Sequence, residues 1–267
     1  MVGLLDPLKV KGLTLKNRIV MPPMHTGLAS LDGSVTDELI EHYVKCSKGL
    51  GLLIVEHSYV SIDGKLTEKQ LGIYGDQLVI GLKRLSHSIH ALGTPIVIQI
   101  NHAGRLANAD ITGTQPVAPS HSENARRLRV KEIQFLAEVF ATAGERAIRA
   151  DFDGVEVHGS HGFLLNQFFS PITNRRHDRY GGSLEHRIRF PLEVVERVKE
   201  KVRGKLLLYR LGSDDMDPAG TRIEDSQKFA LKLEEAGVDI IDAAVDPSNC
   251  RAYKATSYLK PNKSKKW

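Results

Sequence analysis

The chain has 267 residues, of which 41% are hydrophobic and 26% charged, and its formal net charge is +5. This length accommodates one large α/β domain, such as a barrel of about 250 residues. No apolar run reaches the roughly 18 residues that indicate a membrane span, and the N-terminus lacks the basic-then-apolar order of a signal peptide. Cys46 and Cys250 are far apart and show no metal-ligand spacing. The composition therefore predicts a cytoplasmic protein without disulfides, a metal site or membrane contact.

The positive charge is concentrated at the C-terminal end. Six cations and no acid follow Asp246; they are Arg251, Lys254, Lys260, Lys263, Lys265 and Lys266. Without them the rest of the chain is close to neutral, so we expect no nucleic-acid partner. We predict a basic irregular tail at residues 247–267 that contacts solvent.

The first two segments of the chain predict a small hairpin that covers the bottom of a barrel, followed by the first barrel strand. Residues 8–15 alternate in polarity around a glycine, which predicts a small hairpin. Residues 17–24 predict a strand that ends at Pro22 and Pro23. Because proline interrupts a strand ladder, the backbone N–H groups that follow are left available for a ligand.

Strands and helices alternate through the rest of the chain. Continuous apolar runs, typical of strands covered on both faces, occur at residues 52–56, 95–100, 154–157, 206–211 and 238–245. Helical periodicity occurs at residues 36–49, 77–92, 131–150, 183–202 and 225–236. The alternation predicts a parallel sheet of β/α units, as in a TIM (β/α)8-type barrel.

Gln99 and Arg210 are polar residues inside these apolar strands. Gln99 needs a hydrogen-bond partner, because an unpaired buried amide costs about 1–3 kcal/mol. Arg210 needs an anionic partner, which is either a carboxylate of the protein or a bound ligand. Both residues are candidates for ligand binding.

Two histidines, His158 and His161, follow the buried strand at residues 154–157. Polar groups just beyond the C-terminal end of a barrel strand occupy the usual position of an active site. Taken alone, however, two histidines three residues apart also fit one turn of an ordinary surface helix.

The longer motif around these histidines resembles a known family. It reads His-Gly-Ser-His-Gly-Phe-Leu-Leu-Asn-Gln-Phe-Phe-Ser-Pro, followed by Asn174-Arg175 and by Asp178-x-Tyr-Gly-Gly-Ser183. It resembles the Old Yellow Enzyme family of FMN-dependent oxidoreductases, in particular the branch of bacterial ene-reductases and 2,4-dienoyl-CoA reductases. The motif is long and nearly contiguous, so the resemblance is specific.

The resemblance implies a set of flavin-binding residues. Pro22, Pro23, Met24 and His25 match the family's first flavin-binding loop, in which the residue matching His25 modulates the ring; the alternative is a loop histidine in water. The resemblance also implies FMN contacts for His57, Gln99 and Arg210. Gln99 would bond the pyrimidine edge, and Arg210 would face N1 and O2, with a structural salt bridge as its alternative. His57 stands where the family usually has a small residue and could crowd the ring.

The chemistry implied by the resemblance is hydride transfer from NADH or NADPH, through FMN, to the C=C bond of an α,β-unsaturated carbonyl or enoyl thioester. His158 and His161 would hydrogen-bond the carbonyl oxygen. Relatives place a proton-donating tyrosine two residues after the second histidine, where this chain has Phe163. The proton must then come from solvent or from another residue.

The unit count predicts an incomplete barrel within residues 1–246. About six β/α units are present, whereas a closed barrel of this type needs eight. In the family the last two units hold the FMN phosphate. We therefore expect a homo-oligomer or completion by another chain, and we keep two hypotheses open: an ene-reductase, and a non-catalytic or degenerate partial barrel.

Overall fold

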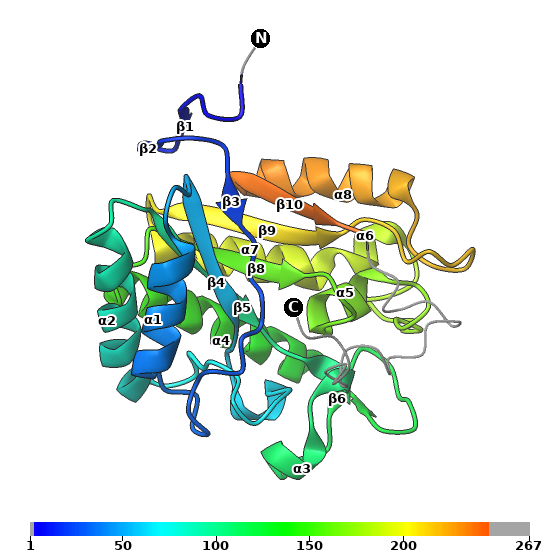
Figure 1. The fold of residues 1–267 in the computed structure, drawn as a ribbon. Helices are drawn as coiled ribbons and strands as arrows, with labels where there is room; N and C mark the ends of the chain where they lie inside the picture. Colours follow the sequence, from blue (N-terminus) through cyan, green and yellow to red (C-terminus); the bar gives the residue numbers. More distant parts are fainter. Residues whose placement is uncertain (1–2, 246–267) are drawn as a thin grey trace, which may run out of the picture.

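The computed structural model describes residues 3–245, and its centre is a curled parallel sheet (Figure 1). The sheet has six strands in the order β10-β9-β8-β5-β4-β3. Their bounds are β3 Val20–Met21, β4 Leu52–Tyr59, β5 Ile96–Asn101, β8 Gly154–Gly159, β9 Leu206–Gly212 and β10 Ile240–Ala244. Strands that are neighbours in the sheet are parallel, so their carboxyl ends meet at one edge.

Five longer helices connect the strands and cover the outer face of the sheet. They are α1 Asp37–Cys46, α2 Val79–His90, α4 Val130–Arg149, α7 Arg189–Val202 and α8 Ile223–Ala236. In Figure 1, α1 and α2 lie beside β4, and α8 runs along the opposite part of the sheet near β10. The predicted βα alternation is therefore confirmed, and with it the TIM-type barrel, here represented by six strands.

Shorter elements lie in the connections. The helices are α3 Ala109–Thr112, α5 Leu164–Phe169 and α6 Leu184–Arg187, and the 3-10 turns are η1 Ile62–Gly64, η2 Asp76–Leu78 and η3 Gly104–Leu106. Two small ribbons are formed by β1 Leu8–Val10 with β2 Leu13–Leu15, and by β6 Val117–Ala118 with β7 Arg126–Arg127. The predicted hairpin at residues 8–15 is therefore confirmed.

Local sequence signals account for the helix ends. The Thr36 side chain accepts a hydrogen bond from the Leu39 N–H, which caps α1. Helix α8 ends at Gly237, whose positive φ of 96° closes the last turn in the left-handed conformation that glycine tolerates. In α4, the Glu132 carboxylate accepts from the Arg129 backbone N–H and begins the helix.

The strands alternate between two faces with different environments. Residues such as Val55, Ile98 and Val157 face the helices and belong to the main hydrophobic core. The intervening residues face inward, where a second apolar cluster contains Leu15, Leu52, Ile54, Val97, Leu206 and Leu208. Side chains of the β1–β2 hairpin pack against this inner cluster and cover its N-terminal end. Because successive residues of a strand point to opposite faces, the same strands contribute side chains to both apolar clusters.

Three predicted elements differ from the observed ones. The helix predicted at residues 183–202 is split into α6 and α7, because Pro191 has no N–H to donate to the Arg187 carbonyl. The segment after the histidines, for which the sequence predicts no helix, contains α5. The strand predicted at residues 17–24 pairs with β4 only at Val20 and Met21.

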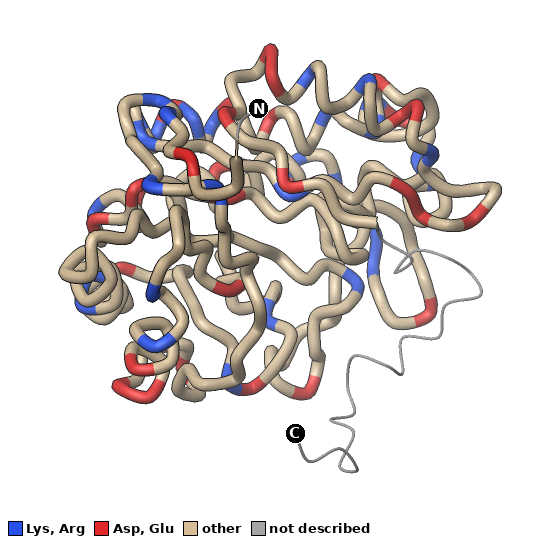
Figure 2. Tube along the Cα trace, turned by 45° about the horizontal axis from the view of Figure 1, so that its top comes forward, with Lys and Arg blue, Asp and Glu red and all other residues tan. Residues whose placement is uncertain are grey.

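The sheet is open within the described residues. Neither β3 nor β10 has a pairing strand on its outer side in residues 3–245. The predicted tail at residues 247–267 lies outside the described residues. Figure 2 shows acidic and basic residues interspersed along the described chain. Among residues 3–245, no helix is both long and apolar enough to cross a membrane.

Candidate active site

The carboxyl end of β8 carries the two predicted histidines. His158 is the fifth residue of β8 and is only 2% exposed, and His161 follows in the turn before α5. The backbone of His161 has a φ of 57°, a left-handed conformation that a non-glycine residue adopts at a cost. The turn brings Nδ1 of His161 within 3.1 Å of Nε2 of His158. The structure therefore places the two histidines together, as predicted.

Neighbouring polar groups orient this pair. The Ser160 hydroxyl lies 3.0 Å from Nδ1 of His161 and 3.4 Å from Nε2 of His158. The Asn101 amide, at the end of β5, lies 3.3 Å from Nδ1 of His158. Burial, followed by the positive field of His161 and its neighbours, lowers the pKa of His158 well below its usual value. His158 is therefore neutral at pH 7 and can act as a hydrogen-bond partner without carrying charge.

Phe163 and His57 complete a cluster of rings beside the pair. The Phe163 ring centroid lies 4.7 Å from that of His158 and 5.3 Å from that of His57. The His57 ring is nearly parallel to the His158 ring, at 6.1 Å, and lies 5.2 Å from the His25 ring. Side chains from β4, β8 and the loop after β3 thus converge on one small region. Phe163 brings no proton donor to it.

The loop after β3 is tied down by a buried carboxylate. Glu56, at 0% exposure on β4, accepts hydrogen bonds from the Thr26 N–H and hydroxyl and lies 2.8 Å from Nδ1 of His25. The Thr67 hydroxyl lies 3.0 Å from Nε2 of His25. His25 is thus held on both sides of its ring, although the residue itself is exposed. An open hollow of about 540 Å³ adjoins it, lined also by Gly27 and Thr67.

The other predicted loop residues differ in exposure. Pro23 is buried and anchors the loop, whereas Pro22 and Met24 are exposed. Contact of these three residues with a ligand stays a prediction.

A layer of polar side chains occupies the inner face of the sheet next to the ring cluster. The Gln99 amide donates to Oε2 of Glu156 at 2.7 Å, across paired strands β5 and β8. Nε of Arg210 lies 3.2 Å from Oδ2 of Asp242, across paired strands β9 and β10. This distance allows an ion pair, but Nε is not aligned for a hydrogen bond and remains unsatisfied. The alternative partner predicted for Arg210, a carboxylate of the protein, is therefore observed in Asp242.

The carboxyl of Glu156 is unusual in this layer. Burial, and then the charge of Asp242, raises its pKa to about 8, despite the opposing effects of Arg210 and Gln99. At pH 7 the protonated, neutral form therefore predominates.

The polar layer contains atoms that a flavin would satisfy. Oε1 of Gln99 and Nδ2 of Asn101 are buried and have no hydrogen-bond partner among the described residues. The pyrimidine edge of FMN offers an N–H donor and carbonyl acceptors, which complement an amide oxygen and amide N–H groups. Because each unsatisfied buried group costs about 1–3 kcal/mol, such a ring fits these residues. The remaining N–H groups of Arg210 could likewise face an electron-rich ring edge.

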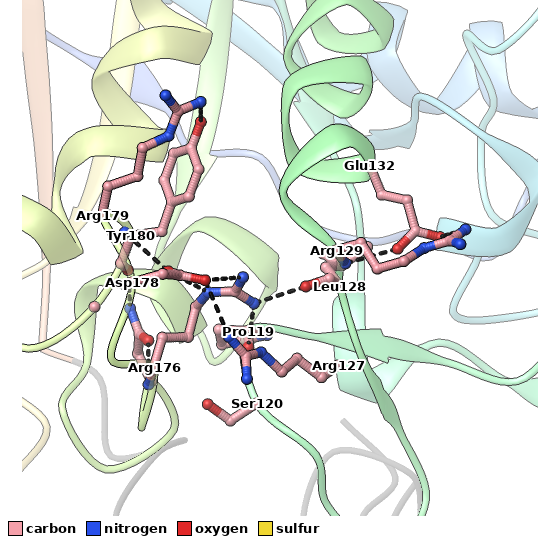
Figure 3. Close-up of polar contacts among 12 residues, drawn as sticks. Pro119, Ser120, Arg127, Leu128, Arg129, Glu132, Arg176, Asp178, Arg179 and Tyr180 are labelled. Atoms are coloured by element: carbon pink, nitrogen blue, oxygen red, sulfur yellow. Dashed lines mark hydrogen bonds and ion pairs between the residues drawn. The ribbon is translucent and has the colours of Figure 1, made fainter.

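The second half of the sequence motif holds the loop that follows α5. The Arg176 guanidinium is buried and donates to the carbonyls of Pro119 and Leu128, each at 2.7 Å, while it also pairs with Asp178 (Figure 3). The Asn174 amide donates to the carbonyls on either side of this loop, at Phe168 and Tyr180. The motif thus has two roles: its histidines belong to the site, and its later residues fix the surrounding loops.

Sequence reasoning missed three polar residues of the site: Glu56, Asn101 and Glu156. Each is 0% exposed and lies in a strand otherwise made of apolar residues, or at its end. The argument that singled out Gln99 and Arg210, a polar group inside an apolar strand, applies to them as well. That signal was present in the sequence.

Comparison with known proteins identifies the family. The chain matches the NADH:flavin oxidoreductase / NADH oxidase family over residues 3–262. It is 43% identical to the NADH oxidase of Thermoanaerobacter brockii over 243 residues, which are 87% of this chain and 37% of that protein. The chain thus spans well under half the length of that relative.

Solved structures agree with this relationship. A complex of 2-naphthoyl-CoA reductase with 2-naphthoyl-CoA superposes with a TM-score of 0.88 at 28% identity, over 91% of this chain and 40% of that one. The Old Yellow Enzyme homologue from Zymomonas mobilis superposes with a TM-score of 0.82 at 31% identity, over 90% of this chain and 72% of that one. The chain therefore belongs to the NADH:flavin oxidoreductase / NADH oxidase family of FMN-dependent oxidoreductases, which includes Old Yellow Enzyme homologues.

Proposed function

We propose that the protein reduces the C=C bond of an α,β-unsaturated carbonyl compound. The observation that carries this proposal is the convergence of His158 and His161, at 3.1 Å, on the edge of the sheet that also carries Gln99. Two imidazoles in this arrangement suit a single carbonyl oxygen that accepts from both. The thioester named in the 2-naphthoyl-CoA complex supports an enoyl thioester as one form of the substrate.

The histidine pair would polarise the carbonyl. When bound, FMN would supply hydride transfer from NADH or NADPH to the β-carbon of the acceptor. His158 and His161 each direct an N–H at the oxygen, which stabilises negative charge as it develops there. For His158 to donate from Nε2, its Nδ1 must accept. The unpartnered Nδ2 of Asn101 supplies the matching donor if the amide is turned by half a rotation.

The α-carbon must then receive a proton. Phe163 contacts His158 but has no exchangeable proton. We propose that solvent or another residue delivers this proton, and that the step is slow as a result.

We also propose a division of the cofactor contacts. Gln99 binds the pyrimidine edge of FMN, Arg210 faces N1 and O2, and the first loop and β4 line the rest of the ring. The residues of the loop and of β4 are Pro22, Pro23, Met24, His25 and His57. The buried, unsatisfied Oε1 of Gln99 supports the assignment of Gln99, whereas Nε of Arg210 lies against Asp242 and leaves the other N–H groups to face the ring.

A further proposal concerns assembly. Within residues 3–245 the outer edges of β3 and β10 have no pairing strand, and such edges promote association. We propose that a second copy or another chain pairs with them. Light scattering over a range of protein concentrations measures this, and a constant monomer mass would contradict it.

The activity is tested with the reduced protein. The FMN-loaded protein is reduced with NADH or NADPH under anaerobic conditions, and its reoxidation by cyclohex-2-enone is followed by flavin absorbance. We expect reoxidation by the enone, whereas the alternative of a non-catalytic relative predicts none. Binding of 4-hydroxybenzaldehyde, a phenol, should give a long-wavelength charge-transfer band.

Variants of the pair make this test specific. His158→Ala and His161→Ala should each weaken phenol binding by about 1–3 kcal/mol, the usual loss for a buried hydrogen-bond partner. His87→Ala is the control, because His87 lies on α2 and pairs with Asp151 on the outer surface. Unchanged phenol affinity in both site variants would remove the pair from the ligand site.

A further inference from the structure

His57 lies at an irregular point of β4 that aims its ring into the site. The pairing of β4 with β5 shifts between Val55 and Ser58, and such bulges commonly redirect side chains beside active sites. The ring of His57 is 7% exposed and lies between the rings of His25 and His158. His57 therefore connects the first loop with the histidine pair.

The buried amide of Gln70 holds His57. The Leu66 backbone N–H, which can only donate, lies 2.7 Å from Oε1 of Gln70 and so fixes the orientation of the amide. Nε2 of Gln70 then donates to Nδ1 of His57 at 2.8 Å and to the His57 carbonyl at 3.2 Å. The amide thus uses its oxygen and both of its N–H groups at 0% exposure.

This arrangement determines which nitrogen of His57 carries the proton. Since Nδ1 accepts a hydrogen bond, the proton of the neutral ring is on Nε2. Among residues 3–245, Nε2 has no hydrogen-bond partner. Burial, and then the positive field of His25 and other neighbours, lowers the pKa of His57 to about 3, so the ring is neutral at pH 7.

We propose that Gln70 is a positioning residue that fixes His57 as its Nε2–H tautomer, and that His57 thereby offers a third, neutral hydrogen-bond donor to a ligand at the histidine pair. The ligand chemistry is an oxygen acceptor, such as a carbonyl, thioester or phenolate oxygen. This ligand identity rests on the proposed function, whereas the tautomer does not.

The tautomer is measured directly by NMR. Histidine is labelled with ¹⁵N, and the His57 ring signals are assigned by comparison with His57→Phe. We expect a protonated Nε2 and an unprotonated Nδ1 in the wild-type protein across pH 6–9. A protonated Nδ1 would overturn the proposal, whether or not FMN or a phenol binds, so this result is distinct from a failure of the proposed function.

Gln70→Glu should reverse the tautomer. The Leu66 N–H still bonds the new carboxylate, which has no N–H to give, so Nδ1 of His57 must supply the proton. At low pH the introduced carboxyl and the His57 ring share one additional proton. When this proton is lost at higher pH, the remaining proton of the ring is on Nδ1, and Nε2 carries no hydrogen. Gln134→Glu, at an exposed position of α4, adds the same charge and should leave the His57 spectrum unchanged. An unaltered His57 spectrum in Gln70→Glu would also overturn the proposal.

Ligand binding tests the donor role. In FMN-loaded protein, His57→Phe should weaken 4-hydroxybenzaldehyde binding about 5- to 150-fold, because one donor to the oxygen is lost. The introduced carboxyl of Gln70→Glu and His57 titrate together, and NMR locates this titration. The affinity of Gln70→Glu for 4-hydroxybenzaldehyde should fall as pH rises through it. Wild-type and Gln134→Glu proteins should lack that inflection. Equal affinities and identical pH profiles in all four proteins would exclude a donor role for His57.

Discussion

The inner face of the sheet has two halves that differ in chemistry. At the N-terminal half, Leu52, Val97 and Leu206 point inward and pack against the β1–β2 hairpin. At the C-terminal half, the same face carries Gln99 and Glu156, which are paired with each other. The backbone pairing is continuous through both halves. One pleated surface thus carries an apolar cluster at one end and buried polar pairs at the other, and we propose that the polar end binds the ligand.

The polar half is stabilised by different interactions from the apolar half. Its residues are buried as completely as the leucines, yet Oε1 of Gln99 and Oε1 of Glu156 are left without partners among the described residues. Unsatisfied buried groups lower stability, so this half gains little for folding. Its polar residues are explained better by a ligand than by the core.

The largest expected effect comes from placing a carboxyl in the apolar half. Leu206→Glu buries it among apolar residues, and we expect a loss of more than about 4 kcal/mol in the free energy of unfolding. Leu231→Glu, at a leucine on α8 that is 60% exposed, is the matched control and should change stability by less than about 0.5 kcal/mol. Urea unfolding measures both. A loss below about 1 kcal/mol for Leu206→Glu would contradict the division of the inner face.

Phe163→Tyr adds a polar group to the ring cluster. A phenol beside His158 would supply the α-carbon proton, and a well-placed general acid accelerates such a step by about 10²–10⁴-fold. Reoxidation of the reduced protein by an enone should accelerate, while flavin reduction by NADH or NADPH should not. Phe135→Tyr, at a phenylalanine exposed on α4, is the control. Unchanged reoxidation would mean that proton delivery does not limit the rate.

Glu156→Gln tests the electrostatics of the polar half. Burial and the charge of Asp242 raise the pKa of Glu156 from 4.5 to about 8, so the folded protein holds a proton that the unfolded chain releases. The wild-type stability therefore decreases as pH rises from about 4.5 through about 8. Glu156→Gln removes this titration and should gain about 1–3 kcal/mol relative to wild type between pH 5 and pH 9.

The exposed Glu234→Gln is the control for that pH series. Thermal unfolding at matched flavin content measures the difference at each pH. Parallel stability curves for Glu156→Gln and wild type would show that Glu156 does not titrate in this window.

Periodicity in the sequence was sufficient to predict most of the sheet and its helices. Helix α4 and strand β5 match their predicted ranges to within a residue because each has a long, regular pattern. Helix α5 gave no such signal, since all six of its residues are buried and no polar face alternates with an apolar one. The break before α7 was predictable from Pro191 but was overridden by the periodic pattern around it.

The candidate site was predictable in part. The family motif located His158 and His161, and the argument from buried polar residues located Gln99 and Arg210. The partner of Arg210 was not predictable, because Asp242 comes from a strand that only the sheet register places opposite it. Gln70 was missed for a similar reason: it lies in a loop, and folding alone brings its amide to His57.

The most direct measurement of the central claim is FMN affinity, followed by quenching of flavin fluorescence. Because we propose that the polar half of the inner face binds the flavin, Gln99→Leu should weaken FMN binding by about 1–3 kcal/mol, or about 5- to 150-fold. Ile98→Val is the matched control, because Ile98 is the adjacent residue of β5 and faces the helices. We predict FMN binding by the wild-type protein, the same affinity for Ile98→Val, and a clear loss for Gln99→Leu. Equal affinity in Gln99→Leu and wild type would contradict the account.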